Sequence, residues 1–287
     1  MSVFGNTISA PDTKRGILQR ACLDLLAEHE RDGALPTSIR FLYYELVQRG
    51  IVSKTRTGAR RTDQDTIDAL TRLREAGRIP WDWIVDETRS LDDYAGDPTI
   101  KQGVIDRLSF IHLDPWRGRA PMILTESRAT AGVLRSTVSE YAARISATNG
   151  QVAGHLRTAI APQLRPGDRA LYLGDYDLAG GQIEDNTRRV LEQEIGGPLQ
   201  WERVALTREQ VEEHDLPVII KSDRRYSDGR PHEAVETEAL RQTVLVDILR
   251  AHLDALLPEP LSRVHERAER QRRIIRRLLV SHRGRKT

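Results

Sequence analysis

Two stretches decide the fold of this chain: ILTESRATAGVL at residues 123–134 and LYLGDYDLAGGQI at residues 171–183. Each is a short apolar run that ends in acidic residues and leads into a segment of helical character. The first run ends at Glu126, and the second ends at Asp175 and Asp177. A strand followed at once by a helix, and then repeated, is typical of an α/β fold with a mostly parallel sheet.

The same alternation extends outward from these two stretches. Besides the two runs, strands are expected at WERVAL and LPVII, and helices at SRATAGVLRSTVSEYAARI, LAGGQIEDNTRRVLEQEIG and REQVEEHD. After Glu238 the chain is expected to be helical to its end, with breaks at Pro258 and Pro260. The sequence therefore predicts an α/β domain over residues 118–240 and a helical segment over residues 241–287.

The acidic strand ends predict a metal site. Ligands of open parallel sheets bind beyond the carboxyl ends of the strands, where Glu126, Asp175 and Asp177 would lie. An all-oxygen set of ligands suits Mg²⁺ or Mn²⁺ rather than zinc. Crowded carboxylates repel one another unless a cation offsets their charge. The glycines beside the pair (Gly174, Gly180 and Gly181) would let backbone or phosphate approach closely.

A simpler interpretation assigns these acids no function. Asp177 would then be the N-cap of a helix over residues 178–195, and Glu126 an ordinary surface acid. A single acid at one strand end would favour this interpretation. Acids at two strand ends, 49 residues apart from Glu126 to Asp175, favour the metal site instead.

The first 95 residues predict a separate helical domain. Three helices are expected here. The first covers residues 13–31 and can be capped by Asp12 or Thr13. The second can be capped by Thr37 or Ser38 and ends at Gly50, and the third covers residues 63–76 and can be capped by Thr62 or Asp63. RIPWDWIVDETR then alternates and is rich in aromatics, which predicts a β-hairpin wing. Three helices and a wing describe a winged-helix module that binds DNA. The alternative is a three-helix protein-interaction domain, and LDDYAGDP is expected to be the linker that follows.

Positive charge is concentrated in two places. The net charge is +2, yet residues 262–287 hold nine arginines and one lysine against two glutamates, and SKTRTGARR precedes the third helix. Such segments contact nucleic acid, form solvated helix faces or make oligomer contacts. The expected DNA contacts are Arg56, Arg60, Arg61, Arg272, Arg273, Arg276 and Arg277.

The composition and the sequence patterns indicate the cellular compartment of the protein. Cys22 is the one cysteine, so no intrachain disulfide forms, and its place in an apolar stripe predicts a core residue. No run reaches the roughly 18 apolar residues that cross a bilayer, and the N-terminus has no secretory signal pattern. We expect a cytoplasmic protein, associated with the DNA of the nucleoid.

The two stretches quoted above resemble the signatures of the Toprim domain, a strand-end Glu and a strand-end Asp-x-Asp. That domain occurs in topoisomerases, primases and some nucleases. The resemblance is strongest to the tyrosine-bearing subunit of topoisomerase VI and its relatives, which include the meiotic double-strand-break proteins. In that family a winged-helix domain precedes the Toprim domain, which agrees with the domain order expected here.

The resemblance implies roles for further residues. The family carries an Arg-x-x-(Tyr/Phe)-Tyr element whose last Tyr is the nucleophile, and residues 40–44, Arg-Phe-Leu-Tyr-Tyr, are similar to it. Tyr44 would then attack a DNA phosphate, Arg40 would contact that phosphate, and Glu126 would complete the catalytic set. KSDRRY and VETEAL resemble late signatures of small bacterial relatives, which would bring Lys221 and Glu236 near the site. The family also implies double-stranded DNA as substrate and a homodimer whose metal serves the partner's tyrosine.

The chain also departs from the family. About 35 residues precede the tyrosine-bearing helix, so we expect no extension that docks an ATPase subunit, and a conventional ATPase partner is doubtful. No GxxxxGK[ST] motif is present. Leu178 also stands where the family commonly has proline. Two alternatives to a tyrosine enzyme therefore stay open: a Toprim endonuclease that uses activated water, and a non-catalytic DNA-binding protein.

Overall fold

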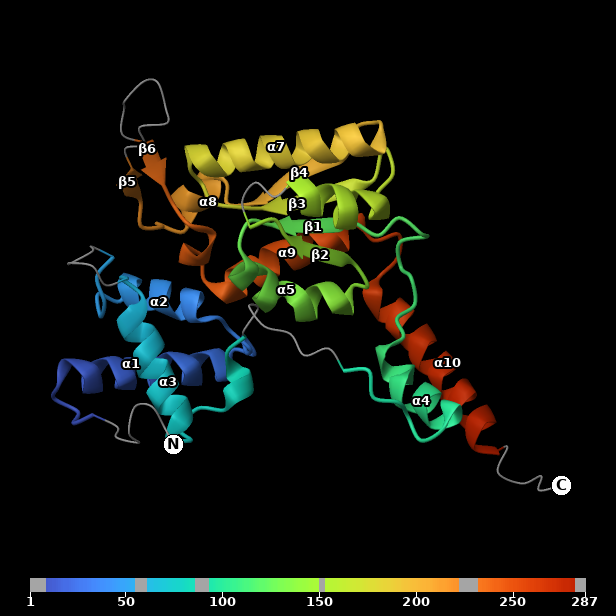
Figure 1. Ribbon diagram of the computed structural model, residues 1–287, viewed down its shortest axis with the longest axis horizontal. Coiled ribbons are helices and arrows are strands. Elements are labelled where there is room, and N and C mark those ends of the chain that lie inside the picture. The colour runs from blue at the N-terminus through green and yellow to red at the C-terminus, as the bar shows by residue number, and fades with distance from the viewer. Residues whose placement is uncertain (1–8, 55–60, 86–92, 150–152, 222–231, 282–287) are drawn as a thin grey trace.

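The computed structural model describes residues 9–54, 61–85, 93–149, 153–221 and 232–281. A four-stranded, all-parallel sheet lies at its centre, in the order β2-β1-β3-β4. These strands are β1 (Met122–Thr125), β2 (Arg144–Ala147), β3 (Arg169–Leu173) and β4 (Gln200–Ala205). The mixed α/β class expected from the alternating runs is therefore confirmed, and helices cover both faces of the sheet (Figure 1).

Alternate side chains of the strands pack against different helices. On one face, Ile123 and Leu171 share a core with α5 (Arg128–Glu140) and α9 (Gln242–Leu256). On the other face, Leu124 and Tyr172 pack with α7 (Leu178–Ile195) and with the helical turns over residues 153–163. Because a strand turns successive side chains to opposite faces, runs that are apolar at every position are needed in this doubly covered sheet.

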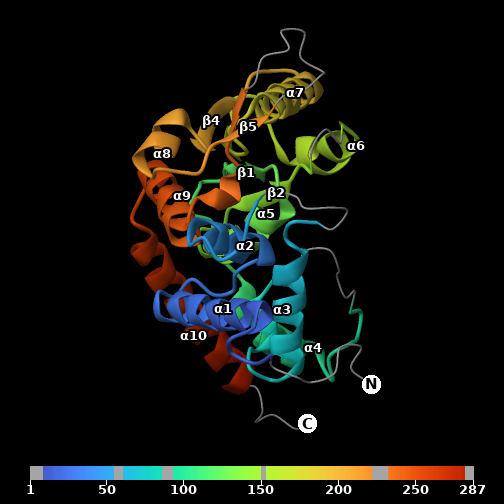
Figure 2. The ribbon, with the colours of Figure 1, turned by 90° about the vertical axis from the view of Figure 1, so that its left-hand side faces the viewer.

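A unit of three helices precedes the sheet. It consists of α1 (Lys14–Arg31), α2 (Ile39–Gln48) and α3 (Gln64–Glu75), close to the expected helices. Thr13 and Ser38 cap the first two through their side chains, and Cys22 lies in the unit's core. Helix α2 also faces the sheet, because Phe41, Tyr43 and Tyr44 belong to the core formed with α5 and α9. Figure 2 shows α2 between α1 and α5.

Three sequence expectations are wrong for residues that the structure describes. The helix expected to reach Ile145 ends at Glu140, and residues 144–147 form the edge strand β2. The strand expected at LPVII forms at Ile219–Lys221 (β5), but pairs antiparallel with His232–Ala234 (β6) outside the main sheet. Residues Trp81–Trp83 form a 3-10 turn rather than a wing strand. The last residues of the expected wing, 86–89, lie outside the described ranges.

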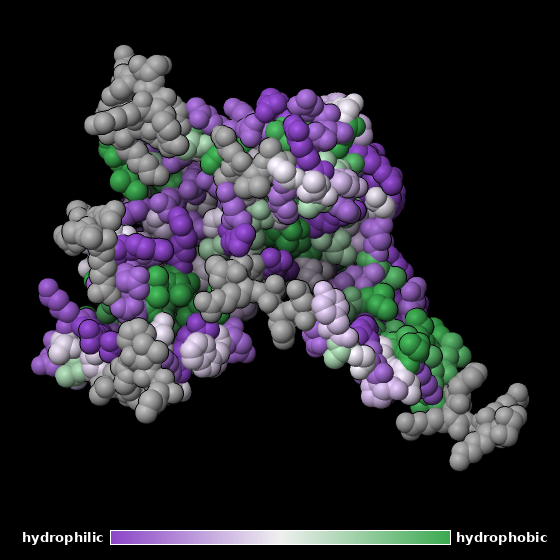
Figure 3. Space-filling model, in the orientation of Figure 1, coloured by the Kyte–Doolittle hydropathy of each residue, from purple (hydrophilic) through white to green (hydrophobic). Residues whose placement is uncertain are grey.

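The remaining helices complete the fold. Helix α8 (Arg208–Glu213) follows β4, where a short helix was expected. Helix α4 (Ile100–Arg107) was not expected, and it packs along α10 (Leu261–Ser281) in an arm that projects from the sheet (Figure 1). Exposed hydrophobic residues gather on this arm (Figure 3), among them Ile274, Leu278 and Phe110. Across the described residues, no helix has both the length and the apolar character that a membrane span requires.

Candidate active site

The tyrosine element lies on α2, on the side of this helix that faces the sheet. Ser38 accepts a hydrogen bond from the backbone N–H of Phe41 and so fixes the first turn, from which Arg40 projects. Tyr44 lies one turn further on, and its side chain is only 3% exposed. Its hydroxyl donates a hydrogen bond to a carboxylate oxygen of Glu236. Tyr43 is buried in the core, as expected for a packing residue.

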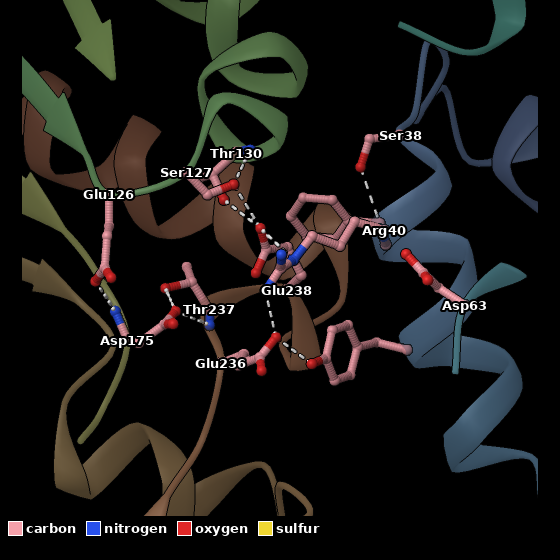
Figure 4. Close-up of polar contacts among 12 residues, drawn as sticks. Ser38, Arg40, Asp63, Glu126, Ser127, Thr130, Asp175, Glu236, Thr237 and Glu238 are labelled. Carbon is pink, nitrogen blue, oxygen red and sulfur yellow. Dashed lines mark hydrogen bonds and ion pairs between the residues drawn. The ribbon is translucent and has the colours of Figure 1, made fainter. Parts of the chain in front are cut away.

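A short segment after β6 joins α2 to the sheet. Val235 exchanges two backbone hydrogen bonds with Tyr176, at 2.9 and 2.8 Å, which places this segment beside the acidic turn after β3. Glu236 and Glu238 then point toward α2, where the Arg40 guanidinium pairs with both carboxylates, at 3.2 Å from Nε to Glu238 (Figure 4). Glu238 also accepts a hydrogen bond from the hydroxyl of Ser127, at 2.6 Å.

The strand-end acids lie on the opposite side of the same segment. The backbone N–H of Asp175 donates to Glu126 Oε2 at 3.2 Å. Asp175 Oδ1 accepts from both the backbone N–H and the hydroxyl of Thr237, at 2.9 and 3.0 Å. Figure 4 shows the resulting row from Glu126 through Asp175 and Thr237 to Glu236. The structure therefore brings Tyr44, Arg40, Glu236, Asp175 and Glu126 into one region of a single chain.

Asp177 has the capping role that the simpler interpretation gave it. Its Oδ1 accepts a hydrogen bond from the backbone N–H of Gly180 at 2.7 Å, at the start of α7. Gly180 is required there because a Cβ would overlap the carbonyl oxygen of Asp175. Gly181 has open space beside it, in a cavity of about 430 Å³ that Asp177 also lines. Capping engages one oxygen of Asp177, and the simpler interpretation is confirmed to that extent.

Burial and mutual repulsion set the electrostatics of the acids. Burial, followed by the carboxylates of Glu238 and Glu126, raises the pKa of Asp175 to about 7. Burial, followed by Asp177 and Glu238, also raises the pKa of Glu126. Each raised pKa means that the charged form is disfavoured in the metal-free chain. Carboxylates that repel one another in this way would be stabilised by a nearby cation.

The donor chemistry fits a hard divalent ion. Glu126 and Asp175 supply carboxylate oxygens, the ligand type that Mg²⁺ and Mn²⁺ prefer. Among the described residues, no three His, Cys, Asp or Glu side chains are grouped closely enough to hold an ion as they stand. Binding of an ion by these acids would therefore require their side chains to turn. A cation would also offset the carboxylate repulsion that, after burial, raises the pKa of Asp175.

Burial and hydrogen bonding determine the protonation state of the tyrosine. Burial, followed by the hydrogen bond to Glu236, raises the pKa of Tyr44 above its ordinary value. The phenol is therefore protonated at neutral pH, and the carboxylate that accepts its hydrogen bond is placed to take its proton. Arg40 in turn holds that carboxylate. A hydroxyl, a carboxylate that can accept its proton and a guanidinium that orients the carboxylate are thus arranged in series.

A cavity of about 390 Å³ opens beside the tyrosine. Among the residues that line it are Tyr44, Arg40, Lys54, Arg61 and Glu236. Lys54 Nζ lies 4.4 Å from the centre of the Tyr44 ring. The Arg61 side chain is largely exposed and pairs with Asp63 at 2.6 Å. Three cations and two carboxylates, those of Glu236 and Asp63, line this cavity, so positive charge is only in slight excess there.

The other expected DNA contacts differ in their placement. Arg272 is not an open contact, because it donates to the carbonyl of Ile111 at 2.6 Å and pairs with Glu269, so it fastens α10 to the chain after α4. The other three arginines expected on this helix, Arg273, Arg276 and Arg277, are exposed, and α10 lies in the projecting arm (Figure 1). Arg56, Arg60 and the side chain of Lys221 lie outside the described residues.

Sequence reasoning missed several residues of the site. Glu238 is 1% exposed and pairs with Arg40, and Thr237 holds Asp175. Arg203 donates to the carbonyl oxygens of Gly174 and Asp175, at 3.0 and 2.6 Å, and so fixes the acidic turn. The stretch VETEAL, already noted for Glu236, contained the signal for Thr237 and Glu238. For Arg203, the signal was a charged residue inside an apolar strand.

Comparisons with protein-family models, curated proteins and solved structures find no match for this chain. The geometry of the site therefore carries the functional conclusion.

Proposed function

We propose that this protein is a Mg²⁺-dependent DNA-cleaving enzyme in which Tyr44 attacks a backbone phosphate. The observation that carries the proposal is the series Tyr44, Glu236 and Arg40, which lies beside Asp175 within one chain. The Toprim resemblance of the two strand-end stretches supports the same reaction. The winged-helix identity of the first 95 residues and the homodimer stay predictions.

In the proposed step, the Tyr44 hydroxyl oxygen forms a bond to phosphorus and its proton passes to the carboxylate of Glu236. The bond from phosphorus to one deoxyribose oxygen breaks, and that oxygen takes a proton from water. The products are a phosphotyrosine diester and a free hydroxyl end. Arg40 and Lys54 would stabilise the charge on the phosphate. A bound Mg²⁺, held by Glu126 and Asp175 with Asp177 as the third expected ligand, would polarise the phosphate oxygens.

In this proposal the nucleophile and the metal ligands belong to the same chain. The family resemblance implies instead that the metal serves the tyrosine of a partner protomer. Tyr44 is hydrogen-bonded to Glu236, and the next residue along the chain, Thr237, is hydrogen-bonded to Asp175. This close connection favours action within one chain. Mixing Tyr44→Phe with Asp175→Asn chains distinguishes the two arrangements: recovered activity in the mixture supports the shared site, and an inactive mixture supports the single-chain site.

A second candidate is a metal-dependent endonuclease in which water attacks the phosphate. The observation in its favour is the raised pKa of Tyr44 together with its burial, since both keep the phenol protonated and covered. In this candidate Tyr44 would only position Glu236, which would then act on water.

The test is cleavage of supercoiled plasmid with Mg²⁺, with Mn²⁺ and with chelator, stopped by detergent. The proposed enzyme gives metal-dependent breaks with protein attached to one side of each break. The water-using enzyme gives breaks whose ends carry free phosphate. Purified protein that binds DNA but yields no breaks with either ion would overturn both candidates.

A further inference from the structure

A second basic cavity lies at the carboxyl end of the edge strand β2. Its volume is about 420 Å³. Its lining includes Arg128, Arg135, Ser146, Thr148, Asn149 and His155. Two arginines, a histidine, two hydroxyls and an amide face this space, and its described lining contains no aspartate or glutamate. This composition is that of an anion site rather than a cation site.

The cavity has a fixed position relative to the acids. The backbone N–H of Thr148 donates to the carbonyl of Thr125 at 2.8 Å, and that of Asn149 donates to the carbonyl of Glu126 at 3.0 Å. Arg128 is the first residue of α5, two positions after Glu126. The cavity and the strand-end acids therefore share one edge of the sheet, on rigid elements.

Local contacts orient the donors. Asn149 has a φ of 46°, a left-handed conformation that asparagine tolerates better than most residues. With its amide turned to satisfy both partners, its carbonyl oxygen accepts from Arg128 Nε at 2.7 Å and from Nη2 at 3.3 Å. Ser146 Oγ and His155 Nε2 are 2.9 Å apart across the cavity's wall. These contacts hold the guanidinium and the imidazole in place before any ligand arrives.

We infer that this cavity binds a phosphate of the DNA backbone beside the phosphate that is cleaved. The inference rests on the proposed function, because it takes DNA as the ligand. Cations would then hold the strand on both sides of the acids: Arg40 and Lys54 near the tyrosine, and Arg128 and Arg135 near β2. Acids alone would repel the backbone, so basic sites beside them are needed to bring a phosphate to the metal.

The experiment measures the affinity of the full chain for a labelled duplex by fluorescence anisotropy, in chelator, over a range of salt concentrations. Arg128→Ala/Arg135→Ala is expected to bind about tenfold more weakly, and the slope of log affinity against log salt falls by about 0.9 for each lost phosphate contact. Arg128→Lys/Arg135→Lys is expected to recover much of the slope. Both arginines are exposed, so these variants are expected to fold.

The matched control is Arg188→Ala/Arg208→Ala, which removes two arginines that pair with glutamates four residues on. If the cavity variant and the control change affinity and slope equally, the inference is wrong. It is also wrong if the cavity variant loses binding to a nucleoside triphosphate but not to the duplex, or if the wild type binds no duplex. Because chelator prevents cleavage, the assay measures duplex binding by the cavity separately from the cleavage reaction, so failure of the one is distinguished from failure of the other.

Discussion

The two sides of the candidate site balance their charges differently. On the α2 side, carboxylates face cations: Arg40 pairs with Glu236 and Glu238, and Lys54 lies 4.0 Å from Glu236. On the strand-end side, Glu126 and Asp175 accept hydrogen bonds from backbone and hydroxyl groups, and burial and neighbouring carboxylates raise the pKa of both. In the proposed reaction, the cations of the α2 side would contact the phosphate, and the acids of the strand-end side would hold the divalent ion.

The largest effect is expected from Asp175→Asn. The amide keeps an oxygen that can accept from Thr237 but removes the charge that would bind Mg²⁺. We expect cleavage to fall on the order of 10³-fold, as for loss of a main electrostatic group, and calorimetric Mg²⁺ binding to weaken. Asp185→Asn, an exposed acid on α7, is the control and should cleave like the wild type. Equal activity of the two variants would refute the role of the strand-end side.

Glu236→Gln is expected to have the next largest effect. Glutamine can still accept the hydrogen bond of Tyr44 but cannot take up its proton, so cleavage should fall about 100-fold. The pH–rate profile should also lose the limb that reports the base. Glu233→Gln, on the exposed side of β6, is the control. A lower rate with an unchanged pH profile would make Glu236 a packing residue and not a base.

Mg²⁺ affinity is expected to depend on pH through Asp175. Its pKa is about 7, above the ordinary value of 3.8, and only the ionised form binds the ion. Affinity should therefore weaken about tenfold per pH unit below 7 and level off above about 8. The stability of the metal-free fold should change in the opposite direction, declining as the pH rises from 3.8 through 7. Calorimetric affinity that is flat across this window would contradict the assignment.

The smallest effect concerns the pairing on the α2 side. Arg40→Met leaves the buried carboxylate of Glu238 without its cation, and we expect a loss of about 2 kcal/mol in the free energy of unfolding. Because the Arg40 side chain is about half exposed, this value is below that of a fully buried pair. Arg49→Met breaks a surface pair with Glu28 and should cost less than about 0.5 kcal/mol. Urea unfolding measures both losses of free energy. Similar losses for the two variants would show that the Arg40 pairing contributes no more than a surface ion pair.

Local patterns predicted much of this molecule. The apolar runs before Glu126 and Asp175 are strands of one parallel sheet, because strands covered on both faces need apolar residues at every position. Thr13 and Ser38 cap the helices they were expected to cap. The strand at residues 144–147 (RISA) was harder to predict, because these residues continue a helical pattern. They form a strand only by pairing with β1. Strand pairing between distant segments leaves little trace in a local pattern.

The site was predictable only in part for a similar reason. Glu126 and Asp175 could be placed together because the ends of parallel strands meet at one edge of a sheet. The contact between Tyr44 and Glu236 joins residues 192 positions apart, and no spacing rule reaches that far. Glu238 is buried against Arg40 by the same long-range packing. A buried glutamate cannot be told from a surface glutamate in the sequence alone.

The most direct test of the central claim is to look for DNA attached to Tyr44. Wild-type protein is incubated with duplex DNA and Mg²⁺, trapped with detergent and digested, and the peptides are analysed by mass spectrometry. We expect a nucleotide adduct on Tyr44, no adduct and no cleavage for Tyr44→Phe, and a wild-type result for Tyr43→Phe, whose hydroxyl is buried. Cleavage by Tyr44→Phe at the wild-type rate, with free phosphate ends and no adduct in any sample, would contradict the account.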